Sequence, residues 1–309
     1  MSRTDEPQEG ASGLLASARQ LLSRELATPP APGLYIVATP IGNLTDISLR
    51  ALAVLARADH ICCEDTRHSQ KLFSAYDIRG RLSAYHDHNA AKERPKILAW
   101  LGEGKAVALI SDAGTPLIAD PGYKLVRAAL EAGHRVYPIP GPSAAIAALS
   151  VSGLPTDTFH FAGFLPPKQA ARRRRLKELA EIPATLVLYE TAQRLTEALA
   201  DLAATMDGRE IVVARELTKH FEEVASGVLP FAKEDGATEW KGEFVLLIGP
   251  PADEEQPQDV VRDALMEALQ RLSLRDAVDE VTRTLRVPRR LVYGLALELQ
   301  KGLSDARNG

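Results

Sequence analysis

A loop rich in glycine, proline and aspartate, SDAGTPLIADPG at residues 111–122, combines residue types that can hold a ligand close to the backbone. It follows the apolar run 106–110 and precedes an amphipathic run at 123–132, so we expect a buried strand, a loop and a helix. In open α/β sheets, ligands bind beyond the carboxyl ends of strands, where this loop lies. Glycine permits close backbone approach and proline restricts the backbone. The loop is long for a plain connection, which favours a binding site over a structural turn.

Two further loops follow predicted strands and have a similar composition. One is TPIGNL at 39–44, and the other is PIPGPSA at 138–144, in which Ser143 can cap the next helix. Neither matches GxGxxG or GxxxxGK[ST], so the sequence supports neither a standard dinucleotide-binding fold nor a P-loop. Loops after neighbouring parallel strands meet at one edge of a sheet, so the three together indicate a composite binding site.

Side chains that can move protons follow two other predicted strands. Glu64 and Arg67 lie in EDTR, and His86 lies in YHDHN. A carboxylate or an imidazole can accept the proton of a nucleophile, so these three residues are catalytic candidates. The structural alternative is that Asp65 caps the following helix and Glu64 pairs with Arg67. The two histidines of YHDHN have no further ligands at a recognisable spacing, so we expect no metal site.

The basic residues are gathered in two places. The densest run consists of Arg172, Arg173, Arg174 and Arg175, and a second group near the carboxyl end includes Arg289 and Arg290. Charge runs are usually solvated helix faces, and the functional alternative is contact with the phosphates of a nucleic acid. Lys and Arg number 37 against 41 Asp and Glu, a net charge of −4, so any contact with RNA has to come from such local patches.

Length and composition describe an ordinary globular protein. The 309 residues are enough for two domains, and 45% of them are hydrophobic. Cys62 and Cys63 are adjacent, which suits neither a disulfide framework nor a metal site with CxxC spacing. No apolar run approaches the length of a membrane-spanning helix, and the amino end does not resemble a secretory signal. We therefore expect a cytoplasmic protein that does not bind membranes.

Hydrophobic periodicity predicts two α/β domains and a helical appendage. We expect a disordered tail at 1–33 with a weak helical pattern at 14–26, an N-terminal α/β domain at 34–153, a second α/β domain at 154–250, a linker at 251–259 and a helical domain at 260–309. Predicted strands lie at 34–39, 58–63, 82–85, 106–111, 135–139, 159–164, 185–189, 210–215, 222–226 and 244–248. Predicted helices lie at 49–56, 68–75, 90–101, 123–132, 144–151, 169–179, 192–205, 260–272, 274–285 and 288–299. The last two have the spacing of a helix-turn-helix.

The motifs TPIGNLTDIS, EDTR, SDAGTPLIADPG, PGPSA, LYE and AREL, in this order, resemble those of the tetrapyrrole-methylase superfamily of S-adenosylmethionine-dependent methyltransferases. Within it, EDTRHS and SDAGTPLIADPG are similar to the small-subunit methyltransferase I family, the bacterial 16S ribosomal RNA cytidine 2′-O-methyltransferases. The resemblance covers about 34–250, and the last helices resemble that family's helix-turn-helix appendage. Many members of the superfamily have Gly-Asp-Pro where this chain has Gly114-Thr115-Pro116, which favours RNA over a porphyrinoid substrate.

The resemblance implies a homodimer of α/β domain pairs with S-adenosyl-L-methionine in the cleft between the two domains. It implies methylation of cytidine 1402 in the decoding centre of 16S ribosomal RNA, in or near the small ribosomal subunit. The implied cofactor contacts are Pro40, Asp112, Ala113, Gly114, Thr115, Ile118, Ser143, Ala144, Glu190 and Arg215. It also puts the loop before the run 172–175 beside the cleft, so we expect RNA contacts from this run and from the C-terminal arginines. The alternatives are a porphyrinoid C-methyltransferase and a non-catalytic ribosome-binding factor.

Overall fold

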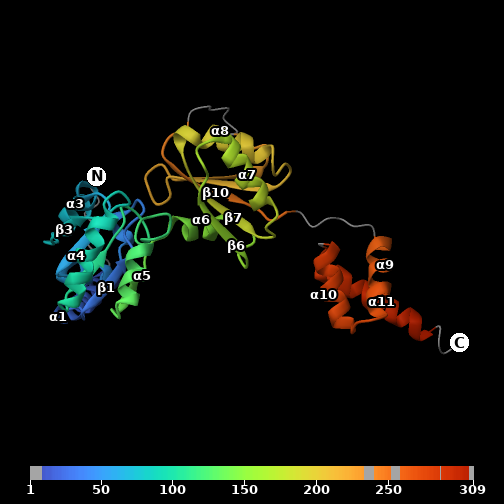
Figure 1. The fold of residues 1–309 in the computed structure, drawn as a ribbon, viewed down its shortest axis with the longest axis horizontal. Helices are drawn as coiled ribbons and strands as arrows, with labels where there is room; N and C mark the ends of the chain where they lie inside the picture. The colour runs from blue at the N-terminus through green and yellow to red at the C-terminus, as the bar shows by residue number, and fades with distance from the viewer. Residues whose placement is uncertain (1–8, 233–239, 252–257, 286, 306–309) are drawn as a thin grey trace. The chain divides into compact units, whose positions relative to one another are not determined.

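The computed structural model describes residues 9–232, 240–251, 258–285 and 287–305. The chain forms two compact units, Met1–Pro250 and Pro251–Gly309, and each is considered by itself (Figure 1). The first part of unit one contains α1 (Glu9–Ala27), β1 (Gly33–Val37), the 3-10 helix η1 (Leu44–Asp46), α2 (Leu49–Arg57), β2 (His60–Cys63), α3 (Thr66–Ala75), β3 (Leu82–Ala84), α4 (Ala90–Gly102), β4 (Ala106–Leu109), α5 (Tyr123–Glu131), β5 (Val136–Ile139) and α6 (Ala144–Ser152). The second part contains β6 (Phe159–Phe164), α7 (Gln169–Ala180), β7 (Thr185–Thr191), α8 (Ala192–Ala203), β8 (Glu210–Arg215), β9 (Glu223–Val228) and β10 (Glu243–Ile248).

The first sheet is parallel and is buried on both faces. Its strand order is β3-β2-β4-β1-β5, and every neighbouring pair runs in the same direction. Successive residues of β1 point to opposite faces, so Leu34 joins the core formed with α4 and α5, whereas Tyr35 joins the core formed with α2 and α3. Continuous apolar strands are typical of such two-sided burial. The strands β4, β1 and β5 are adjacent, so the loops that follow them lie side by side at the carboxyl edge.

The second sheet is mixed and has the order β6-β7-β10-β8-β9. Strands β6 and β7 are parallel, and the other neighbours are antiparallel. In β7, Leu186 and Leu188 pack on the side of α7 and α8, while Val187 packs on the opposite face, which α6 covers (Figure 1). We predicted the helix of α6 as the last element of the N-terminal domain, but its side chains lie in the core of the second sheet.

Helix α1 lies in the stretch that we expected to be a disordered tail. It contacts α2, and the Arg57 guanidinium donates a hydrogen bond to the carbonyl of Leu26 near the end of α1. The apolar positions of this helix were too sparse to make helix formation clear from the sequence. Packing against a neighbouring helix supplies stability that a short isolated helix lacks.

The described residues of the second unit form a small domain of three helices. It contains α9 (Gln258–Leu269), α10 (Leu274–Leu285) and α11 (Arg289–Asp305), as the periodicity predicted. Val261 of α9, Val278 of α10 and Val292 of α11 are fully buried in a common core. The whole architecture, two α/β sheets followed by a helical appendage, confirms the predicted fold class. Within the described residues, no helix combines the length and the apolarity needed to cross a membrane.

Candidate active site

A cleft of about 270 Å³ is lined from both sheets of unit one. One wall is made by the loops after β1, β4 and β5, and the other by the ends of β6, β7 and β8 and the start of β10. Eight of the ten residues that the resemblance proposed for cofactor binding line it: Asp112, Ala113, Gly114, Thr115, Ile118, Ser143, Ala144 and Glu190. The sequence therefore located this cleft, whereas the role of each of these residues stays a prediction.

Hydrogen bonds join the three loops of the first wall. The backbone N–H of Thr39 donates to the carbonyl of Gly114 at 2.9 Å, and the N–H of Gly114 donates back to the carbonyl of Thr39 at 3.0 Å. The hydroxyl of Thr115 donates to the carbonyl of Pro142 at 3.0 Å. These bonds cross between neighbouring strand ends, so the loops meet as we predicted. Ser143 occupies the N-cap position of α6 but makes no capping bond with its side chain, which lines the cleft instead.

The backbone around the cleft is held in unusual conformations. Four non-glycine residues near it have positive φ angles: Leu117 (74°), Ala119 (65°), Glu216 (48°) and Thr218 (64°). Elsewhere in the described residues, Asp77 is the other non-glycine residue of this kind. Such conformations cost about 1–3 kcal/mol each and tend to occur at functional sites, where surrounding contacts maintain them. Their concentration in the loops after β4 and β8 marks this cleft as a functional site.

Glu190 is a buried carboxylate at the end of β7 that lines the cleft. It is 2% exposed, and its Oε1 accepts the backbone N–H of Thr191 at 2.9 Å. Its Oε2 lies 3.3 Å from Nη2 of Arg194 without forming a hydrogen bond in the structure. Burial raises the pKa of Glu190, and the N–H of Thr191 and the charge of Arg194 offset part of that rise. Because Oε2 of Glu190 accepts no hydrogen bond within the protein, it can accept one from an N–H or O–H group of a ligand in the cleft.

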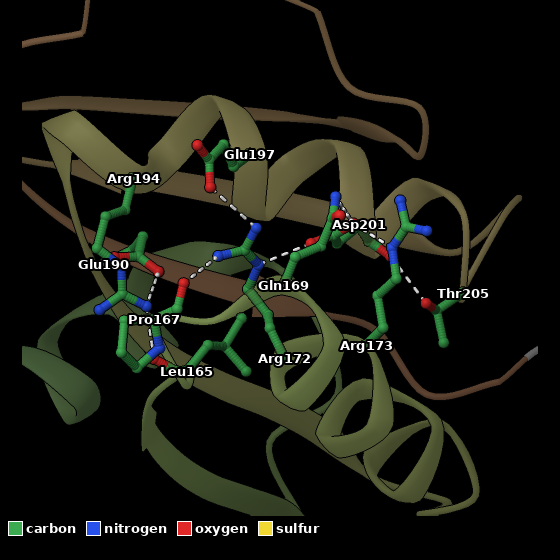
Figure 2. A network of polar contacts seen from close by, with 10 residues as sticks. All are labelled: Leu165, Pro167, Gln169, Arg172, Arg173, Glu190, Arg194, Glu197, Asp201 and Thr205. Carbon is green, nitrogen blue, oxygen red and sulfur yellow. Dashed lines mark hydrogen bonds and ion pairs between the residues drawn. The ribbon is translucent and has the colours of Figure 1, made fainter.

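Arg194 also anchors the backbone next to another cleft residue. Its guanidinium donates to the carbonyl of Leu165, which follows Phe164 at the end of β6 (Figure 2). The Phe164 ring lines the cleft and meets the Tyr189 ring edge to face at 5.6 Å between centroids. One arginine on α8 therefore supports both the carboxylate of Glu190 and the loop that carries Phe164.

On the opposite side of this wall, the ammonium group of Lys219 pairs with two carboxylates of the protein itself. Nζ of Lys219 lies 2.9 Å from Oε1 of Glu216 and 2.8 Å from Oε2 of Glu243. Burial alone would raise the pKa of Glu216, but the bonds from Lys219 and from the N–H of Glu243 lower it. Glu216 is therefore ionised at neutral pH, and Lys219 bridges the loop after β8 to β10.

Tyr189 joins the second sheet to the first wall. Its hydroxyl oxygen accepts the backbone N–H of Ala145 at the start of α6, at 3.2 Å. Burial raises the pKa of this phenol, so it stays protonated and can donate into the cleft. Two aromatic rings, Phe161 and Phe164, surround its own ring. The cleft thus has a rigid aromatic patch on this side.

The three catalytic candidates lie next to the cleft but do not line it. Asp65 caps α3 by accepting the N–H of Arg67 at 2.7 Å, as the structural alternative predicted, and no ion pair between Glu64 and Arg67 forms in the described chain. The backbone N–H of Asp65 donates to Oδ1 of the cleft residue Asp112 at 3.1 Å, which ties the two loops together. Burial and the charge of Asp112 raise the pKa of Glu64, while His86 lowers it. Glu64 therefore contributes to the electrostatics behind the cleft wall, and the catalytic roles stay predictions.

Two of the proposed cofactor contacts also lie outside the lining. Pro40 precedes Ile41, which does line the cleft. The side chain of Arg215 is bound elsewhere, since its Nε donates to the carbonyl of Lys241 at 2.7 Å and its Nη1 lies 3.1 Å from Glu223. Alternation along β8 explains this, because successive side chains leave opposite faces of a strand.

Arg172, the first residue of the predicted RNA-binding run, is a core residue instead. Its side chain is 1% exposed and its Nε contacts Oδ2 of Asp201 at 2.7 Å (Figure 2). It also contacts Glu197 of α8 at 3.1 Å and donates to the carbonyl of Pro167 at 3.3 Å. A guanidinium enclosed in this way does not reach a phosphate, so the expectation of RNA contact is wrong for Arg172. The helix turns this one residue of the run toward α8, which the sequence spacing alone did not show.

The other arginines are accessible. Arg173 is half exposed and shares Asp201 with Arg172, at 2.6 Å. Arg174 is exposed, and Arg175 pairs with Glu178 one turn later at 3.0 Å. In the second unit, Arg289 is exposed and contacts Asp279 at 2.8 Å, and Arg290 is also exposed. RNA contact by these five residues stays a prediction.

The sequence did not identify several cleft residues. They include Asp120, Phe164, Tyr189, Lys219 and Glu243. Asp120 lies within the predicted loop after β4, and this position in the sequence could have identified it as a cleft residue. The others come from the second sheet, whose mixed strand order no motif specified. Within the described residues, no group of three or more histidine, cysteine or acidic side chains is arranged to hold a metal ion.

Comparison with known proteins agrees with the motifs. The family model described as tetrapyrrole (corrin/porphyrin) methylases matches residues 33–232, and the model described as RsmI C-terminal HTH domain matches residues 254–300. A uroporphyrin-III-C-methyltransferase from Thermus thermophilus shares the fold, with a TM-score of 0.50 and 23% identity over 71% of this chain and 94% of that one.

Two relatives are much more similar. Both are named ribosomal RNA small subunit methyltransferase I. The protein from Mesorhizobium japonicum is 46% identical over 92% of this chain and 97% of its own length. The protein from Escherichia coli O157:H7 is 48% identical over 86% of this chain and 95% of its own length. The chain therefore belongs to the tetrapyrrole methylase family and, within it, to the ribosomal RNA small subunit methyltransferase I family.

Proposed function

We propose that this protein transfers a methyl group from S-adenosyl-L-methionine to the ribose 2′-hydroxyl of a decoding-centre cytidine in 16S ribosomal RNA, cytidine 1402. The observation that carries this function is the cleft, because eight of the ten residues taken from the family resemblance line one cavity although they come from three separate segments, the loop after β4, the start of α6 and the end of β7. Membership of the family agrees with an RNA substrate. Its proposed setting is the cytoplasm, where the chain acts as a homodimer on the small ribosomal subunit.

The residues of the cleft fit the proposed methyl donor. At Gly114, an added Cβ would lie 3.3 Å from Cγ2 of Ile41, which is a tight contact between two cleft residues, so a side chain here would crowd the cleft. Oε2 of the buried Glu190 accepts no hydrogen bond in the structure, so it is available to accept one from an amino or hydroxyl group of the methyl donor. The apolar side chains of Ile118 and Phe164 suit the adenine ring or the carbon chain of the donor. When bound, the donor supplies the electrophilic methyl group on its sulfonium.

The protein itself aligns the reacting groups and excludes water from them. Methyl transfer to a hydroxyl is an in-line displacement, so holding oxygen, carbon and sulfur in line lowers the barrier. The bonds from Thr39 to Gly114 and from Thr115 to Pro142 fix the loops for this purpose. A sugar hydroxyl also needs a proton acceptor during the reaction.

The decisive experiment uses small ribosomal subunits from a bacterial strain that lacks this enzyme. The full-length protein is incubated with them and with methyl-labelled S-adenosylmethionine, and the labelled nucleotide is located by mass spectrometry. We expect one labelled cytidine carrying the methyl group on the ribose. Donor binding in calorimetry without any transfer to RNA would support the non-catalytic ribosome-binding factor instead.

A matched reaction with uroporphyrinogen tests the porphyrinoid alternative. We expect no methylated porphyrinoid product, because this chain has Thr115 where many superfamily members have aspartate and carries exposed arginines that a small tetrapyrrole does not require. Label in the porphyrinoid and none in the RNA would overturn the proposed substrate. Sedimentation equilibrium of the same preparation measures whether the protein is a dimer.

A further inference from the structure

Five carboxylates line the cleft in the described residues: Asp112, Asp120, Glu190, Glu216 and Glu243. A carboxylate that accepts backbone N–H groups or pairs with a cation loses basicity, because these partners stabilise its charged form. A proton acceptor for a hydroxyl must instead have a free lone pair and a pKa near the working pH. The partners of each carboxylate therefore decide which of them can take the proton.

Four of the five are already engaged. Glu216 and Glu243 share the ammonium of Lys219, at 2.9 Å and 2.8 Å. Glu190 accepts the N–H of Thr191 and has the guanidinium of Arg194 at 3.3 Å. Asp112 accepts the N–H of Asp65 at 3.1 Å. Each of these carboxylates has a positioning or structural partner.

Asp120 has neither a cation nor a backbone N–H as a partner among the residues that the structure describes. The groups that face it are the carboxylate of Glu64 after β2, Asp112 and the hydroxyl of Ser111 after β4, and the phenol of Tyr189 on β7. The pKa of Asp120 is raised to about 6, because burial and the charges of Glu64 and Asp112 together outweigh the opposing effect of the Ser111 hydroxyl. It is therefore ionised at neutral pH and is a stronger base than an ordinary aspartate.

The local backbone presents this side chain to the cleft. Leu117 and Ala119, three residues and one residue before Asp120, both have positive φ angles, and Gly122 follows with φ at 139°. A Cβ at Gly122 would meet Cδ2 of Leu109 at 2.8 Å, so the loop passes tightly over the end of β4. A loop that maintains two strained residues beside one carboxylate is typical of a functional position.

We propose that Asp120 accepts the proton of the acceptor hydroxyl during methyl transfer, a role that rests on the proposed function. The ribose oxygen forms a bond to the methyl carbon while the bond from that carbon to sulfur breaks. The hydroxyl proton passes to the carboxylate of Asp120, which becomes a neutral carboxylic acid. The products are the ribose methyl ether and S-adenosylhomocysteine, so charge and atoms balance. Glu64 acts through Asp120, because its negative charge keeps the base strong.

The test compares Asp120→Asn, Asp120→Glu and Glu64→Gln with the wild-type protein, and uses Asp77→Asn as an exposed control. We expect Asp120→Asn to lower kcat by about 10²–10⁴-fold, the usual contribution of general base catalysis. Its affinity for S-adenosylmethionine, measured by calorimetry, should change less than twofold. Asp120→Glu should regain part of the lost kcat, because it restores a carboxylate.

The pH profile distinguishes a base from a structural residue. In the wild-type protein, kcat should fall with decreasing pH around pH 6, where Asp120 becomes protonated. Glu64→Gln should move this fall to lower pH, because removing a negative neighbour lowers the pKa of Asp120. Carbon-13 NMR of the aspartate carboxyl groups in the ligand-free protein should show the same displacement for the resonance that Asp120→Asn removes.

The outcomes separate this role from the proposed function. No methylation of RNA by the wild-type protein would overturn the function itself. Methylation by a folded Asp120→Asn protein at the wild-type rate and with the same acidic limb would overturn the role of Asp120 alone. An Asp120 resonance whose pKa is not raised above the ordinary value of an aspartate would also overturn it.

Discussion

Asp201 of α8 accepts a hydrogen bond from Nε of Arg172 on α7 at 2.7 Å, and both side chains are 1% exposed. The pair is the centre of a network in which Arg173 shares the other oxygen of Asp201 and Arg172 reaches the carbonyl of Pro167 (Figure 2). A buried charge is tolerated when its hydrogen bonds are satisfied. The basic run on α7 therefore divides into residues that hold the fold and residues that face solvent.

Arg172→Ala should destabilise the protein by about 3 kcal/mol, because it leaves Asp201 buried with a weaker set of partners. Arg174→Ala is the matched control on the same helix, and its exposed side chain should change stability by less than about 0.5 kcal/mol. Urea unfolding followed by circular dichroism measures both. Equal stability of the two variants would mean that the buried pair contributes no net stability.

Gly114 and Gly133 offer a second matched pair, since their φ angles are 78° and 79°. Replacing either by tryptophan introduces similar backbone strain, of about 1–2 kcal/mol. At Gly114 the new side chain also enters the cleft, whereas nothing lies within 4 Å of a Cβ at Gly133. We expect calorimetry to show donor binding lost in Gly114→Trp and kept in Gly133→Trp. Wild-type affinity in a folded Gly114→Trp protein would remove this loop from the binding site.

Arg194 should act as a positioning residue for the cleft. Arg194→Met leaves the buried Glu190 without its cation and releases the carbonyl of Leu165. The pKa of Glu190 should then rise further, and donor affinity should fall by at least about tenfold, or 1.4 kcal/mol. Arg194→Lys should recover part of the affinity, because it restores the charge but not the planar fork.

The control for Arg194 is Arg127→Met, which breaks an exposed pair with Glu131. This variant should keep wild-type affinity for the donor. Donor affinity is measured in these variants at several pH values between about 5 and 8. Equal affinity in Arg194→Met, Arg194→Lys and wild-type protein at every pH would show that Arg194 only stabilises the loop.

The exposed arginines make a separate prediction about RNA. Neutralising Arg174 and Arg290, each by alanine, should weaken binding to small ribosomal subunits and reduce the slope of log K against log salt by about 0.7 per lost phosphate contact. Donor affinity should not change, because neither residue lines the cleft. Filter binding across a salt series gives the affinity for small ribosomal subunits and the slope of log K against log salt. An unchanged slope in the double variant would identify these arginines as ordinary solvated residues.

The sequence predicted the position of every described strand to within a few residues, because strands in both sheets are short runs rich in apolar residues and bounded by turn-forming residues. It also predicted the first wall of the cleft, since that wall consists of consecutive residues in loops after strands. The second wall could not be predicted in the same way. Tyr189 lies on β7 and Lys219 lies in the loop after β8, and the two strands are held together in the sheet by β10, a pairing between residues distant in the chain.

Arg172 shows a different limit. Four consecutive arginines look equivalent in a sequence, and the helical period of 3.6 residues decides that one of them faces the protein. The position of Asp201, 29 residues further along the chain, then makes burial possible. A carboxylate on the inner face of a predicted amphipathic helix, as Asp201 is, was the available signal for a buried ion pair.

The first loop and the loop after β8 are joined at the rim of the cleft, where the backbone N–H of Asn43 donates to Oγ1 of Thr218 at 3.1 Å. These two loops belong to opposite walls of the cleft, so this bond is present only while the walls are together at this point. Separation breaks this bond and exposes the Asn43 amide to solvent. Hydrogen–deuterium exchange at that one amide therefore measures how often the two walls separate.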